Sequence, residues 1–79
     1  MPKVLEINGF TFFFYSQEGN EPPHIHVRKA GNTAKFWLDP INLVENYGFS
    51  SSQMQFINST IKDNHHLLIE SWNEFFYGA

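Results

Sequence analysis

Alternating hydrophobic and polar residues in the first half of the chain predict β-strands. Apolar runs over residues 4–7 and 10–15 flank Asn8-Gly9. This pair is typical of a two-residue type I′ hairpin turn, because both central residues of that turn need φ > 0. A two-residue turn places Lys3 opposite Phe14, and alternation gives the second strand one apolar face. The residues of that face, which we expect to be buried, are Phe10, Phe12 and Phe14.

A second hairpin is predicted where residues 24–30 and 33–38 flank Gly31-Asn32. Taking Gly31-Asn32 as its turn, the opposite pairs are Arg28 with Lys35, His26 with Trp37 and His24 with Asp39. These six side chains share one polar face. The other face is apolar and should be buried; it carries Ile25, Val27, Ala34, Phe36 and Leu38.

After this hairpin, Asp39-Pro40 fits a helix N-cap followed by proline at the first helical position. We therefore predict a short helix that includes Val44 and ends at Gly48, with an extended passage as the alternative. Ser50 and Gln53 have the spacing of a capping box, which marks the start of another helix.

Apolar residues from Met54 to Phe75 recur at helical spacing and predict one long C-terminal helix. The polar residues 63–66 are the point where this helix would kink or split. We expect His65 and His66 to be solvated, with His66 pairing with Glu70 one turn later. The aromatic residues assigned to the core rather than to a ligand site are Trp72, Phe75 and Phe76.

These elements predict a single α+β domain over residues 1–79. Its architecture is a four-stranded antiparallel β-meander packed on one face by the long C-terminal helix, with the short helix between them. The chain has 79 residues and no cysteine, so nine Phe, three Tyr and two Trp must supply most of the core. One helix covers only one sheet face, so Phe13, Tyr15 and Trp37 on the other face predict a homo-oligomer or a protein partner.

The net charge of −3 argues against a protein that coats DNA through many phosphate contacts. The N-terminal residues 1–4 show no signal-peptide pattern, and no apolar run approaches the ~20 residues that span a bilayer. We therefore expect a cytoplasmic protein that does not associate with membranes.

His24 and His26 are the main candidates for catalytic chemistry. Residues two apart on a strand point the same way, roughly 6.5–7 Å apart, and imidazoles near neutral pH serve as general acid and base. Arg28 and Lys35, if opposite each other, would bind an anion such as a phosphodiester. The aromatic side chains expected to stack an RNA base are Tyr15 and Trp37. The alternative is that both histidines only pack at the loop end.

A metal site is the other alternative, with His24, His26 and Asp39 as its ligands. Arg28 and Lys35 oppose a dication there, and Asp39 is already explained as a helix cap. We therefore expect no bound metal and no cofactor. The nearby acidic residues Glu18 and Glu21 fit a solvated loop.

Several segments resemble a family of short bacterial domains of unknown function marked by Pro-Pro-His-x-His-Val. They are residues 21–29, 34–40, 48–50 and 70–76, in that order. This resemblance implies a protein encoded beside another small protein, as in a toxin–antitoxin-like pair. We therefore favour a binding or regulatory module that acts with a small protein partner. The alternatives are a metal-independent ribonuclease or phosphodiester hydrolase and, third, a metal-dependent enzyme.

Overall fold

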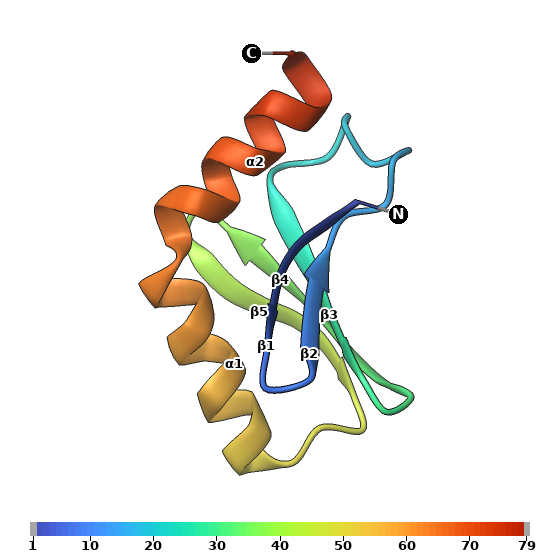
Figure 1. The fold of residues 1–79 in the computed structure, drawn as a ribbon, viewed down its shortest axis with the longest axis vertical. Coiled ribbons are helices and arrows are strands. Elements are labelled where there is room, and N and C mark those ends of the chain that lie inside the picture. Colours follow the sequence, from blue (N-terminus) through green and yellow to red (C-terminus); the bar gives the residue numbers. More distant parts are fainter. Residues whose placement is uncertain (1, 79) are drawn as a thin grey trace.

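The computed structural model describes residues 2–78 as an antiparallel five-stranded sheet followed by two helices (Figure 1). The elements are β1 (Lys3–Ile7), β2 (Phe10–Phe13), β3 (His24–Lys29), β4 (Asn32–Leu38), β5 (Ile41–Tyr47), α1 (Ser51–Asp63) and α2 (His65–Tyr77). Each strand pairs with the next in chain order. The predicted α+β class is confirmed, but there are five strands rather than four. Within residues 2–78, no helix is long and apolar enough to cross a membrane.

The first hairpin follows the prediction apart from one irregularity. Asn8 and Gly9 have φ angles of 52° and 82°, as the type I′ turn requires. An irregularity in β1 places Lys3 opposite Phe13 rather than Phe14. The Phe14 N–H instead donates to the Pro2 carbonyl at 3.0 Å. The three phenylalanines predicted for the core face are buried, as expected: Phe10, Phe12 and Phe14.

The second hairpin turns one residue earlier than predicted, at Ala30-Gly31, whose φ angles are 50° and 84°. The observed opposite pairs are Arg28 with Thr33, His26 with Lys35 and His24 with Trp37. The predicted register is therefore wrong by two residues. Because side chains alternate with a period of two, this shift leaves every residue on its predicted face. The apolar face is buried as expected, with Ile25, Val27, Ala34, Phe36 and Leu38 at most 3% exposed.

The short helix predicted after Asp39-Pro40 is wrong and the alternative, an extended passage, is confirmed, because these two residues form the turn into β5. Leu38 lies opposite Ile41, so the chain reverses directly into a fifth strand. An Asp-Pro pair suits a turn as well as a helix start. The β-branched and aromatic residues that follow favour a strand.

The capping box at the start of α1 is confirmed. The Gln53 N–H donates to Ser50 Oγ at 3.2 Å, and the Ser50 N–H donates to Gln53 Oε1 at 2.9 Å. The single long helix is wrong, because the chain divides at Asn64, within the polar stretch expected to kink. The Asn64 amide donates to the Thr60 carbonyl at 2.8 Å. His65 bonds to the Leu38 carbonyl and is half-buried, so its predicted solvation is also wrong.

Replacing Ser50 with alanine should lower the free energy of unfolding by about 1 kcal/mol, because the Gln53 N–H loses its acceptor. Urea unfolding followed by circular dichroism would measure the change. Ser59 is exposed on the same helix, and its alanine variant is the matched control. Equal losses in the two variants would contradict a specific capping role.

Both helices lie along one face of the sheet and close over the core (Figure 1). The side chains with no exposed surface that join the two layers include Phe12, Ile25, Ile57, Ile61, Leu68 and Trp72. On the opposite face, Phe13 is only 2% exposed, because neighbouring side chains of the sheet cover it. The His26 ring stacks on Phe13 at 5.5 Å and the Tyr15 ring meets it edge-on at 5.2 Å. The exposed aromatic surface on this face of the sheet is therefore smaller than predicted.

Candidate functional site

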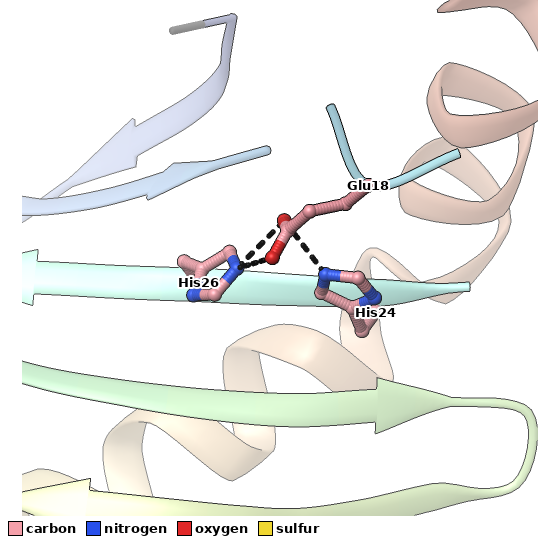
Figure 2. Close-up of side chains that lie close together, drawn as sticks. All are labelled: Glu18, His24 and His26. Atoms are coloured by element: carbon pink, nitrogen blue, oxygen red, sulfur yellow. Dashed lines mark hydrogen bonds and ion pairs between the residues drawn. The ribbon is translucent and has the colours of Figure 1, made fainter. Parts of the chain in front are cut away.

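The two histidines of β3 converge on Glu18, which belongs to the loop between β2 and β3 (Figure 2). His24 Nε2 lies 2.8 Å from Glu18 Oε1, and His26 Nε2 lies 2.9 Å from the same oxygen. The second carboxylate oxygen is 3.1 Å from His26 Nε2. Strand alternation brings the imidazoles to one side of β3. One carboxylate therefore bridges both rings.

The loop that carries Glu18 is anchored both to itself and to α2. The Glu18 backbone N–H donates to the Tyr15 carbonyl at 3.3 Å, and the Tyr15 N–H donates to Glu18 Oε1 at 3.3 Å. Gly19 lies so close to Phe76 that a Cβ built on Gly19 would be 2.6 Å from a ring carbon. The Tyr77 hydroxyl donates to the Gly19 carbonyl at 3.4 Å. The prediction of a merely solvated loop is therefore wrong at Glu18.

His24 has no exposed surface, and its two ring nitrogens both face oxygen atoms. Its ring lies 4.8 Å from the Trp72 ring, measured between centroids. His24 Nδ1 is 3.0 Å from the Pro22 carbonyl oxygen, which can only accept a hydrogen bond. His24 Nε2 faces the Glu18 carboxylate, which is also an acceptor when ionised. Both ring nitrogens of this fully buried imidazole therefore face hydrogen-bond acceptors.

The pKa values of Glu18 and His26 are both lowered, but for different reasons. Burial alone would raise the pKa of the Glu18 carboxyl, but the bonds from His24 and His26 outweigh it and hold that pKa below its usual value. Burial lowers the pKa of the His26 imidazole, and the bond to Glu18 offsets only part of this effect. Glu18 is therefore favoured as an anion and His26 as a neutral donor.

The predicted pairing of Arg28 opposite Lys35 is wrong, so the two cations expected to bind an anion do not face each other. Lys35 Nζ pairs with Glu21 Oε1 at 3.0 Å and lies 4.8 Å from the Trp37 ring centroid. Arg28 lies opposite Thr33 instead, with its guanidinium 5.2 Å from the Phe13 ring centroid. Arg28 and Lys35 therefore lack the geometry on which two predictions depended. One was that they bind an anion together, and the other was that they repel a metal dication from the histidines.

The other predicted site residues divide between the cluster and the surface. Tyr15 meets the His26 ring edge-on at 4.7 Å and is 44% exposed, and Trp37 lies 5.7 Å from the His24 ring. Asp39 is exposed in the β4–β5 turn and is not opposite His24. Glu18 takes the position in the cluster that the sequence assigned to Asp39.

The predictions for α2 have mixed outcomes. His66 and Glu70 form the expected exposed ion pair at 3.1 Å. Trp72 is fully buried and Phe76 packs against the core, but Phe75 is 46% exposed and its assignment to the core is wrong.

Glu18 is the site residue that sequence reasoning missed. The only signal for it was a carboxylate in a polar loop that ends at the histidine pair, because loops carry no periodicity. The anchoring of that loop by α2 depends on residues almost 60 positions later.

The profile of one protein family matches residues 9–73, which run from the first hairpin turn into α2 and include the whole cluster. The chain belongs to the DUF4160 family. Its description is Domain of unknown function (DUF4160), so the predicted resemblance to a family of unknown function is confirmed at that level. Searches of curated proteins and of solved structures gave no match.

Proposed function

We propose that this DUF4160 domain is a small binding module that takes up an extended apolar segment of a protein partner along β5. A groove beside the unpaired edge of β5 carries this proposal. In line with the cysteine-free sequence, the proposed setting is the bacterial cytoplasm, and the proposed partner is a small protein of a regulatory, toxin–antitoxin-like pair.

β5 is the last strand of the sheet, so its outer backbone edge faces no other strand among residues 2–78. Three of its large hydrophobic side chains are exposed: Leu43 at 51%, Val44 at 40% and Tyr47 at 62%. Exposed apolar side chains on an unpaired edge favour the addition of a strand. The edge residues therefore suit an extended partner segment.

The groove lies between β5 and α1 and has a volume of about 550 Å³. Leu43 lies opposite Phe36 and so belongs to the helix-facing side of the sheet, yet α1 leaves it half exposed. Met54 of α1 forms part of the far wall. Alternate apolar side chains of an added strand would enter this groove and cover Leu43.

A dedicated partner is favoured over a second copy of the chain. The pairing of β4 with β5 shifts register between Leu43 and Glu45, which leaves Val44 as a bulge. Bulges on edge strands disfavour indiscriminate edge-to-edge pairing.

The ribonuclease alternative requires both imidazoles to reach the substrate. His24 has no exposed surface, and neither His24 nor His26 lines any of three surface grooves of about 410–550 Å³. A general acid or base must approach within hydrogen-bond distance of the substrate. Binding at β5 is therefore the better supported function.

The Leu43→Glu variant should bind the partner at least about tenfold more weakly, because it would place an unpaired carboxylate in an apolar contact. Proteins retained by the wild type would be identified by mass spectrometry, purified and titrated by calorimetry. Leu67 is 44% exposed on α2, so Leu67→Glu is the matched control. Equal binding by wild type and Leu43→Glu, or equal loss in both variants, would refute docking at β5. Sedimentation that showed a dimer dissociated by Leu43→Glu would replace the partner with a second copy.

A further inference from the structure

The Glu18, His24 and His26 cluster can do more than hold the loop to the sheet. Its three ligand atoms, one from each side chain, all lie within 4.8 Å of one another (Figure 2). Two imidazole nitrogens and a carboxylate oxygen are a donor set suited to zinc and other first-row transition metals. We propose that these three residues bind a divalent transition-metal ion of the zinc type.

Two of the three distances between ligand atoms fit such an ion. Metal bonds of about 2.0–2.2 Å to nitrogen and oxygen place neighbouring ligand atoms roughly 2.8–3.5 Å apart in tetrahedral or octahedral geometry. Glu18 Oε1 is 2.8 Å from His24 Nε2 and 2.9 Å from His26 Nε2. The third distance, between the two imidazole nitrogens, is within 4.8 Å, so the histidine side chains would adjust around the bound ion.

The surroundings of His24 match those of a metal-ligating histidine. Such histidines donate the N–H of the second ring nitrogen to a backbone carbonyl or a carboxylate, which leaves the other nitrogen free to bind the metal. His24 Nδ1 has this arrangement with the Pro22 carbonyl at 3.0 Å.

The charges around the cluster are compatible with a bound dication. Glu18 contributes one negative charge directly. Lys35, a cation whose charge acts on His26, is paired with Glu21 at 3.0 Å, so the two charges largely cancel. The Glu21 carboxylate also lies 3.9 Å from His24 Nδ1.

Three protein ligands leave at least one coordination position on the ion for water or for a group from another molecule. Glu18 and His26 keep 18% and 14% of their side-chain surface exposed, whereas His24 keeps none. The open position would therefore face the solvent side of the cluster, towards Tyr15. This inference concerns a different surface from β5 and stands independently of partner docking.

Titration of chelator-treated protein with zinc chloride in a calorimeter should show one ion per chain. Glu18→Gln and His26→Gln should each weaken binding by on the order of 100-fold, since each removes a ligand while keeping most of the side-chain volume. His66→Gln is the matched control, because His66 also pairs with a glutamate but on an exposed helix surface. Circular dichroism would verify that each variant is folded.

The wild type alone provides a second measurement. On addition of zinc, the side-chain ¹⁵N resonances of His24 and His26 should move, and those of His65 and His66 should not. No zinc binding, binding that survives both ligand substitutions, or resonance changes confined to His66 would overturn the proposal and leave the cluster as a structural ion pair. Zinc binding should be unchanged in Leu43→Glu, which separates this site from the β5 surface.

Discussion

Replacing Trp72 with alanine is expected to lower the free energy of unfolding by about 3–5 kcal/mol. Trp72 has no exposed surface and lies between α2 and the sheet. Its ring meets the Phe14 ring edge-on, with 5.2 Å between centroids. The tilted rings of Phe76 and His24 lie at centroid distances of 4.2 Å and 4.8 Å. A domain of 79 residues has a total stability of roughly 4–12 kcal/mol at 0.05–0.15 kcal/mol per residue, so this loss would remove much of it. Urea unfolding followed by far-UV circular dichroism would measure it.

Two controls separate packing from other effects. Phe75 is 46% exposed on the same helix, so Phe75→Ala should cost much less than Trp72→Ala. Trp72→Phe should also cost less, because the indole Nε1 has no hydrogen-bond partner among residues 2–78 and phenylalanine removes this unsatisfied donor. If Trp72→Ala unfolds at the same urea concentration as wild type, the ring is not the central packing element that its burial indicates.

The faces of the sheet could be predicted from sequence because side-chain alternation survives errors in register. Ile25 and Val27 are buried and His26 points the other way, although the β3–β4 turn lies one residue earlier than predicted. The prediction failed at the turn because a type I′ turn with alanine at φ 50° is unusual. Pairing along the rest of the hairpin determines the turn, and local propensity does not reveal it.

The fifth strand and the break between α1 and α2 could not be predicted from local sequence alone. Asp39-Pro40 suits both a helix start and a tight turn, and only its position between two pairing strands decides between them. At Asn64 the polar stretch predicted a weak point. The division there depends on contacts that the helical period does not encode, since His65 bonds to the Leu38 carbonyl across the fold.

Half of the candidate site was predictable. The alternation of β3 placed His24 and His26 on one side, but it gave no indication of which carboxylate would meet them. Asp39 was the natural candidate from the assumed register, and the observed register places Trp37 opposite His24 instead. Glu18 reaches the cluster because α2 anchors its loop, a contact between distant parts of the chain that neither composition nor periodicity predicts.

This anchoring leads to the last prediction, for Gly19→Ala. A Cβ at Gly19 would lie 2.6 Å from a ring carbon of Phe76, so the loop or the ring must move. The added steric strain should lower the free energy of unfolding by about 1–3 kcal/mol. Because Glu18 is the adjacent residue, the imidazole resonances of His24 and His26 should shift at the same time. Asn20→Ala, an exposed change in the same loop, should alter neither quantity.

A double-mutant cycle with Phe76→Leu tests the cause of this effect. Leucine is smaller and more flexible than the phenylalanine ring, so it should make room for the added methyl group. The loss of unfolding free energy in the double variant should then be smaller than the sum of the losses in the two single variants. The difference, the interaction energy, should be roughly 0.5–3 kcal/mol. The imidazole resonances should also return towards their wild-type positions. Simple additivity of the two losses, with unchanged histidine resonances in Gly19→Ala, would show that the contact between Gly19 and Phe76 does not position Glu18.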